Sequence, residues 1–237
     1  MSVQKNTAGE IFPVARGRAR VLNLTFHGVG EPPPENEYKK SDIWLSVETF
    51  ESVLDVIKER KEIVITFDDG NKSDLEIVLP ILIKRGIKAA FFICPGNFDR
   101  PDYLTGRNVR SLSQAGMIIG SHGVHHYNWR RLKDEELFEE LSVSKKLLEQ
   151  KTGREVSYAA CPKGSYDRRV LCFLRRAGYE RVYTSDTGYS RTDAWLQSRT
   201  TIHSNINSDM LNQIISWHLW SSTEFIRKIK RFIKRWR

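Results

Sequence analysis

Residues 62–70 read EIVITFDDG, an apolar, β-branched run that ends in two adjacent carboxylates and a glycine. A continuous apolar run without polar alternation is typical of a strand buried on both faces, as in parallel β/α folds. Asp68 and Asp69 stand where this strand would end, and Gly70 permits a tight turn there. Reactive groups of parallel β/α folds gather at the carboxyl ends of the strands, so this stretch predicts both a fold and the position of a site.

Similar apolar runs recur along the chain and alternate with segments of helical period. The predicted strands are 20–26, 62–67, 88–93, 117–121, 156–161, 179–184 and, weakest, 196–202. The predicted helices cover about 47–60, 74–85, 134–151 and 167–178, with Ser46 and Asp167 as N-caps and with Gly86, Gly153 and Gly178 where they end. No internal repeat interrupts this alternation. It favours a single barrel-like α/β domain.

The composition is that of a globular protein. The chain has 237 residues, of which 40% are hydrophobic and 11% aromatic, enough to bury a core. Three cysteines without framework spacing argue against a disulfide scaffold. No stretch reaches the roughly 20 apolar residues that span a bilayer. Residues 1–20 lack the apolar run of a secretion signal, so we expect a cytoplasmic protein.

The net charge of +9 is concentrated at the carboxyl end of the chain. Residues 225–237 carry seven basic residues and no acid, which leaves +2 on the other 224 residues. The apolar residues of this tail form one helical stripe, made of Phe225, Ile226, Ile229, Phe232, Ile233 and Trp236. Such a helix could lie on an anionic membrane surface or pack its stripe on the barrel, and the sequence does not decide between the two. Nucleic-acid binding is not expected, because the rest of the chain has no basic excess.

Three histidines follow the fourth predicted strand, in the stretch SHGVHH at 121–126. His122 and His126 are four residues apart and could bind one metal ion, although His122 and His125 could also do so. Two histidines and a carboxylate such as Asp69 would make a three-ligand site with an open position for water, as in hydrolytic zinc enzymes. An ordinary Asp-Gly turn is the alternative interpretation of residues 68–70.

Two other strand ends carry polar or turn-forming residues. His27 follows the first strand, where a lone histidine is more often structural than catalytic. The fifth strand runs into CPKGSY at 161–166, a turn whose backbone N–H groups could face the same site.

Together, TFDDG at 66–70, SHGVHH at 121–126 and PKGSYD at 162–167 resemble the motifs of the polysaccharide deacetylases of carbohydrate esterase family 4, the NodB homology domain. The resemblance covers roughly residues 20–215. It implies a distorted (β/α)7 barrel and metal-dependent removal of N- or O-acetyl groups from sugars. It also implies that Asp69, His122 and His126 bind the metal and that Asp68 is the general base. Zn²⁺ is the expected ion, with Co²⁺ or Ni²⁺ as alternatives.

The chain departs from the pattern of that family at several positions. Ala160 stands two residues before Pro162, where the family usually has an arginine that orients the catalytic aspartate. Lys163 replaces an aromatic residue whose backbone N–H is assigned to the oxyanion. No late Leu-x-His motif supplies the general acid. Instead, residues 24–29 resemble the first strand of the permuted poly-N-acetylglucosamine deacetylases, which gives His27 that role. Gly28 replaces the acid that commonly follows this histidine.

These observations predict a deacetylase acting on the N-acetyl groups of a glycan. Three domain segments are expected, namely an extension at 1–19, the deacetylase domain at 20–220 and the basic amphipathic helix at 221–237. We expect Pro162, Tyr166 and Trp129 to contact the substrate, since aromatic rings stack on sugars. One alternative is an amide hydrolase for a lipid-linked sugar. Another is a catalytically weak glycan-binding protein, which the residues at Ala160 and Gly28 would favour.

Overall fold

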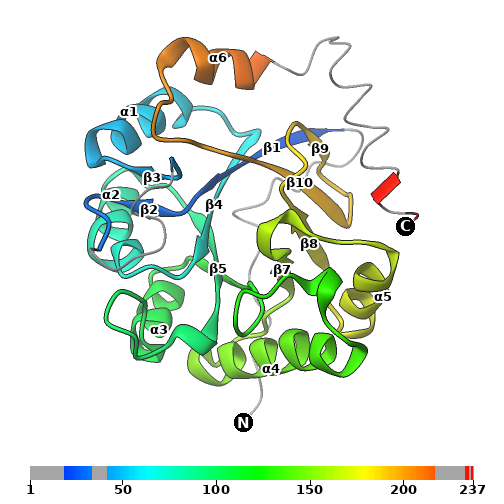
Figure 1. Ribbon diagram of the computed structural model, residues 1–237. Helices are drawn as coiled ribbons and strands as arrows, with labels where there is room; N and C mark the ends of the chain where they lie inside the picture. Colours follow the sequence, from blue (N-terminus) through cyan, green and yellow to red (C-terminus); the bar gives the residue numbers. More distant parts are fainter. Residues whose placement is uncertain (1–18, 34–41, 217–232, 235, 237) are drawn as a thin grey trace.

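The computed structural model describes residues 19–33, 42–216, 233, 234 and 236. Parallel strands form a closed barrel in the order β1-β4-β5-β6-β7-β8-β10, and β10 pairs with β1 to close it (Figure 1). The barrel strands are β1 (Arg20–Phe26), β4 (Ile63–Asp69), β5 (Ala89–Ile93), β6 (Ile118–Ser121), β7 (Tyr158–Ala160), β8 (Arg181–Thr184) and β10 (Leu196–Thr201). The predicted seven-stranded α/β barrel is therefore confirmed, and each predicted strand overlaps one strand of the barrel.

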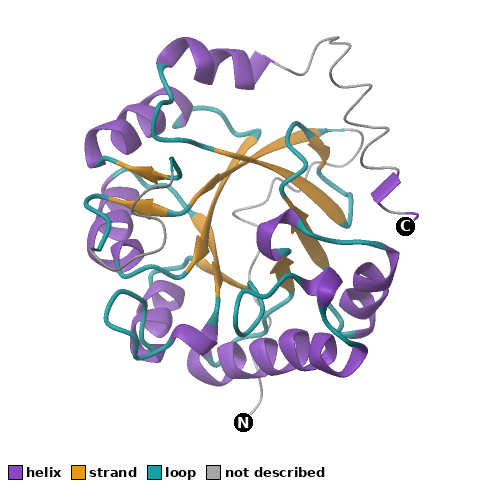
Figure 2. Ribbon diagram, in the orientation of Figure 1, coloured by secondary structure: helices purple, strands orange, loops and turns teal. Residues whose placement is uncertain are grey.

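The helices cover the outer face of the barrel (Figure 2). They are α1 (Val47–Ile57), α2 (Leu79–Lys84), α3 (Gly106–Gln114), α4 (Asp134–Thr152), α5 (Arg168–Arg176) and α6 (Ser208–Ser216). The predicted N-caps are confirmed, because Ser46 accepts from the backbone N–H of Thr49 and Asp167 accepts from that of Val170. A π-helical turn, η3 (Asp74–Val78), precedes α2 where a continuous helix was predicted, and Pro80 lacks the N–H that a regular helix would need there.

Short elements complete the described fold. Strands β2 (Gly28–Val29) and β3 (Trp44–Leu45) pair with each other, and β9 (Ser190–Arg191) runs antiparallel to the start of β1. The 3-10 turns are η4 (Pro95–Asn97), η5 (Trp129–Arg131) and η6 (Pro162–Gly164). Helices α3 and α6 were not predicted; each is short and buries only two apolar residues, Val109 and Leu112 in α3 and Leu211 and Ile215 in α6.

Strand alternation divides the core into two layers. The outward-facing side chains pack under the helices, and the stacked rings of Phe26, Phe67 and Phe91 lie on three neighbouring strands there. The second layer, which we call the lumen cluster, draws residues from the barrel strands alone: Val21, Val64, Ala90, Phe92, Ile118, Tyr158, Ala160 and Tyr183. The same alternation turns Thr66 and Asp68 inward after Val64. The lumen is thus apolar at one end and polar at the carboxyl ends of its strands.

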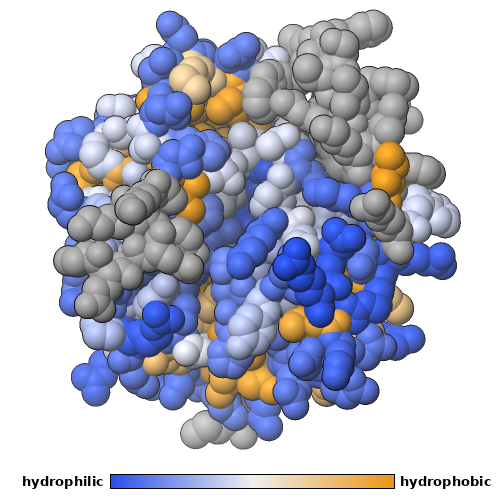
Figure 3. Space-filling model, in the orientation of Figure 1, coloured by the Kyte–Doolittle hydropathy of each residue, from blue (hydrophilic) through white to orange (hydrophobic). Residues whose placement is uncertain are grey.

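Most of the basic tail lies outside the described residues, so its contact with a membrane stays a prediction, as do the cytoplasmic location and the domain boundaries. Of the tail, Lys234 donates to the buried carboxylate of Asp186 at 2.6 Å, which places this residue against the barrel. Among the helices that are described, none has the length and apolar character needed to cross a membrane. The visible face is largely hydrophilic, with small separate apolar areas (Figure 3).

Candidate active site

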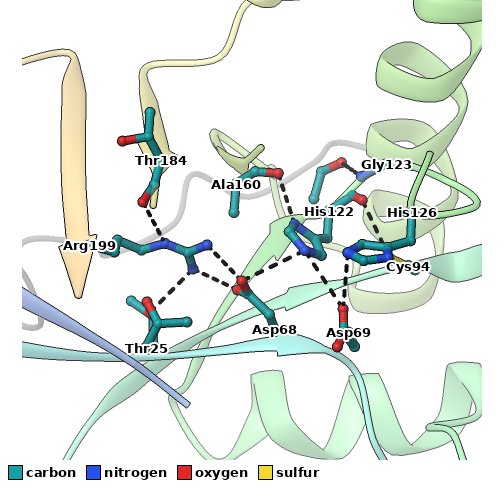
Figure 4. A network of polar contacts seen from close by, with 12 residues as sticks. Thr25, Asp68, Asp69, Cys94, His122, Gly123, His126, Ala160, Thr184 and Arg199 are labelled. Atoms are coloured by element: carbon teal, nitrogen blue, oxygen red, sulfur yellow. Dashed lines mark hydrogen bonds and ion pairs between the residues drawn. The ribbon is translucent and has the colours of Figure 1, made fainter. Parts of the chain in front are cut away.

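The predicted polar residues meet at one end of the barrel. Asp68 and Asp69 end β4, and His122 directly follows β6. His126 lies on the loop after β6, and His27 directly follows β1. Because all barrel strands are parallel, their carboxyl ends open on the same edge, and residues far apart in sequence converge there. Figure 4 shows Asp68, Asp69, His122 and His126 turned toward one another.

One group of side chains among the described residues could hold a metal ion, namely Asp69, His122 and His126. Oδ1 of Asp69 lies 3.7 Å from Nε2 of His122 and 3.6 Å from Nε2 of His126. The three ligand atoms are all within 4.8 Å of one another. Ligand atoms held at about 2.0–2.2 Å around a tetrahedral ion stand about 3.4 Å apart, so this spacing fits a zinc-sized ion. The donor set of two imidazoles and one carboxylate suits the same ion.

The backbone of two of these ligands departs from ordinary strand geometry. Asp69 has φ +76° and His126 has φ +58°, both in the left-handed region that non-glycine residues rarely adopt. Strict alternation would turn Asp69 away from the lumen after Asp68, and its left-handed backbone lets both carboxylates serve one site. Such strain is found where function fixes the geometry.

His122 is oriented by the strand beside it. Its Nδ1 donates to the carbonyl oxygen of Ala160 at 2.9 Å, which leaves the lone pair of Nε2 directed at Asp69. Burial lowers the pKa of His122 to about 3, so the ring is neutral at ordinary pH. A neutral imidazole whose other nitrogen is hydrogen-bonded is the form that binds metals. His125 takes no part in this set, and its ring lies against Tyr127. The structure thus groups His126, which the family resemblance also indicates, with Asp69 and His122.

The loop that carries the two histidines is anchored by Glu140 of α4. The buried carboxylate of Glu140 accepts from the backbone N–H groups of Val124 and His125, each at 3.0 Å. Between the histidines, Gly123 has φ +77°, and a Cβ there would stand 2.4 Å from Oε2 of Glu140. The glycine permits both the turn and the close approach of the carboxylate. One side chain on a helix thus fixes the loop from which both histidines project.

Arg199 of β10 is the main residue that sequence reasoning missed. Its Nη1 and Nη2 donate to the two carboxylate oxygens of Asp68, both at 2.6 Å. Only 1% of the Arg199 side chain is exposed. Burial alone would raise the pKa of Asp68, but the guanidinium of Arg199 and the neighbouring imidazoles hold this pKa well below its ordinary value. The sequence did contain an indication of this position, because the alternation of side chains along β10 turns Gln197 and Arg199 toward the lumen. That strand was the weakest prediction.

A third carboxyl group, that of Asp74, lies near this pair and is fully buried. Burial, followed by repulsion from Asp69 and Asp68, raises the pKa of Asp74 well above its ordinary value, while a hydrogen bond from the backbone of Asn71 acts to lower it. The surroundings of Asp74 therefore disfavour a third negative charge beside Asp68 and Asp69.

His27 and Lys163 lie at the same end of the barrel. His27 is partly buried and is close enough to Asp68 to be among the groups that lower its pKa. After it, Gly28 has no room for the acid expected from the family pattern, because a Cβ would stand 2.2 Å from the ring of Trp44. Lys163 lies in η6 after the buried Pro162 and has a left-handed backbone at φ 57°, with an exposed side chain.

The expectation that Trp129 and Tyr166 contact a substrate is corrected by their burial. Trp129 is 0% exposed and Tyr166 is 1% exposed. The Tyr166 hydroxyl donates to Asp186 at 2.5 Å. A ring packed on both faces offers no surface to a sugar, so these residues support the loops around the site instead. Tyr127, on the loop of the histidines, keeps 52% of its surface exposed.

Sequence comparison finds relatives of this chain among known deacetylases. The sequence pattern of the polysaccharide deacetylase family matches residues 55–182. The protein YxkH of Bacillus subtilis (strain 168) is 25% identical over 189 residues, which cover 74% of this chain and 68% of YxkH. The peptidoglycan-N-acetylmuramic acid deacetylase PdaA of the same strain is 29% identical over 131 residues, 54% of this chain and 48% of PdaA.

Solved structures show the same fold. The Streptococcus pyogenes deacetylase PplD, in complex with acetate, superposes with a TM-score of 0.76 at 20% identity, covering 84% of this chain and all of PplD. The chain belongs to the polysaccharide deacetylase family. It is accordingly a hydrolase that acts on carbon–nitrogen bonds other than peptide bonds.

Replacing Glu140 by glutamine should weaken metal binding without touching a ligand. Glutamine keeps the size of Glu140 but replaces one of its two acceptor oxygens by an NH₂ group, so the N–H of Val124 or that of His125 loses its shortest hydrogen bond. We expect the affinity for Zn²⁺ to fall about 10-fold or more, as for other groups that hold ligands in place. Calorimetric Zn²⁺ titration measures this, with the exposed neighbour variant Glu139→Gln as the control. Equal affinities in the two variants would contradict the assignment.

Proposed function

We propose that this protein is a metal-dependent deacetylase that hydrolyses the N-acetyl groups of a glycan built from N-acetylhexosamines. The observation that carries the proposal is the ligand set of Asp69, His122 and His126 directly beside a carboxylate, Asp68, that Arg199 keeps ionised. Zn²⁺ is the ion we propose, with Co²⁺ or Ni²⁺ as substitutes. When bound, it would polarise the acetamide carbonyl and make the attacking water more acidic.

The side chains around this set have separate tasks. Asp68 accepts the proton of the attacking water, for which it must be ionised and fixed in position. His27 donates a proton to the nitrogen that leaves, since an amine anion is a poor leaving group. The backbone N–H of Lys163 donates to the oxygen that becomes negative. His122 and His126 would hold the ion through their ring nitrogens.

The choice of an N-acetylated glycan has two supports. PdaA is named for its action on N-acetylmuramic acid in peptidoglycan, although this chain spans only about half of its length. Outside the basic tail the chain carries only +2, which suits a neutral sugar polymer better than a strongly anionic one. N-acetylglucosamine oligomers are therefore the first substrates to test.

A comparison of adjacent histidines tests the metal site. His126→Ala should lose the bound ion and the release of acetate, because Asp69 and His122 alone leave the site incomplete. His125→Ala, one residue away on the same loop, should keep both. Metal content after dialysis and acetate release from N-acetylglucosamine oligomers measure the outcome. A full complement of metal in His126→Ala would exclude this ligand set.

The role of His27 can be tested through the leaving group. His27→Ala should keep its metal and lose about 10²–10⁴ of kcat on an N-acetyl sugar, whose amine must be protonated as it leaves. The same variant should lose much less activity on 4-nitrophenyl acetate, whose phenolate leaves without a proton. Steady-state assays of both substrates with one enzyme preparation provide the comparison. Equal losses on the two substrates would show that His27 is structural.

A further inference from the structure

We propose that Arg199 of β10 is the positioning residue for Asp68, and that it takes the place of an arginine carried by the fifth barrel strand, where this chain has Ala160. The inference rests on the proposed function, because it concerns the base of that reaction. In this chain the arginine that orients the base would come from the last barrel strand, β10, and not from the strand that precedes Pro162.

The geometry of Arg199 is that of a group that fixes an orientation. Two parallel hydrogen bonds of 2.6 Å join its guanidinium to both oxygens of Asp68, which prevents the carboxylate from rotating. The guanidinium is itself held, since Nη1 also reaches the hydroxyl of Thr66 at 3.3 Å and Nε reaches the carbonyl of Thr184 at 3.4 Å. It lies 5.2 Å from the ring centroid of Phe92. Strands on several sides thus hold one planar fork in place, as Figure 4 shows for Thr184 and Asp68.

Ala160 is the complementary half of this arrangement. It lies on β7 and is a buried member of the lumen cluster, as are Phe92 and Tyr183, so its side chain faces the same lumen that Arg199 enters from β10. The guanidinium of Arg199 lies over the ring of Phe92, another member of this cluster. A small residue at 160 leaves this part of the lumen to the guanidinium. An arginine at both positions would put two cations beside one carboxylate and overfill a packed interior.

The carbonyl group of Ala160 is used even though its side chain is small. It accepts from Nδ1 of His122, which orients that ring toward Asp69. Strand β7 therefore still supports the site through its backbone, while the cation comes from β10. The absence of arginine at position 160 is consequently no sign of a disabled enzyme.

The experiment removes the arginine at position 199 and places an arginine at position 160. Four proteins are compared with the unchanged chain: Arg199→Ala, Arg199→Lys, the double variant Arg199→Ala/Ala160→Arg, and the control Arg191→Ala, which removes an exposed arginine of β9. Each is loaded with Zn²⁺ and assayed for kcat and KM on N-acetylglucosamine oligomers, for metal content and for melting temperature.

Arg199→Ala should lower kcat about 100-fold or more with KM and metal content little changed. The double variant should recover at least 10-fold of that loss. Arg199→Lys keeps the charge but lacks the fork, so it should fold and bind Zn²⁺ while losing about 10-fold or more of kcat. If Arg199→Ala does not fold, Arg199→Lys still tests the inference. The control should match the unchanged chain.

Some results would overturn the inference. Unchanged kcat in Arg199→Lys or in a folded Arg199→Ala would do so. A double variant that folds and binds Zn²⁺ but is no faster than Arg199→Ala would refute the exchange of positions. If the unchanged chain itself releases no acetate, it is the proposed function that fails. The two failures are therefore distinguishable.

Discussion

The pairing of Asp68 with Arg199 is the constraint on which the rest of the site depends. Both charges are buried in the lumen, and a buried charge is tolerated only when it is paired and hydrogen-bonded. The barrel meets this requirement by closing β10 against β1, which brings the last strand within two places of β4. Barrel closure thus makes an ionised Asp68 compatible with a dry interior. Next to this ion pair the lumen contains a polar layer that includes Thr25 and Thr66, whose hydroxyl groups are hydrogen-bonded to each other.

Two adjacent carboxylates acquire different properties from this arrangement. Asp68 faces a cation, which keeps it ionised and fixes its orientation. Asp69, turned by its left-handed backbone, faces two imidazoles that are suited to share an ion with it. Neighbouring carboxyl groups with different surroundings are how one site supplies different chemical roles. Burial and the charges of Asp68 and Asp69 raise the pKa of Asp74, which disfavours a third negative charge in this division.

The sequence predicts those parts of the molecule that local pattern determines. Apolar runs predicted the barrel strands, most weakly the largely polar β10. The spacing of His122 and His126 together with the family pattern predicted the ligand set with Asp69. Arg199 could not be assigned in this way, because its partner is 131 residues away and their contact exists only once the barrel has closed. The burial of Trp129 and Tyr166 escaped for a related reason, since aromatic residues near a site have the same pattern whether they line it or support it.

Departures from a family pattern have to be judged against the space around them. At Gly28, the ring of Trp44 occupies the place of any larger side chain, so no acid can follow His27 here. At Ala160, the small side chain faces a lumen that also receives the guanidinium of Arg199 from β10, two places away in the barrel. Stability alone gives little reason to keep that guanidinium, because replacing a buried ion pair by apolar groups of the same volume is often neutral or stabilising. A pair retained at the end of the lumen, with its carboxylate beside a metal-type ligand set, is better explained by the chemistry that an oriented, ionised Asp68 performs.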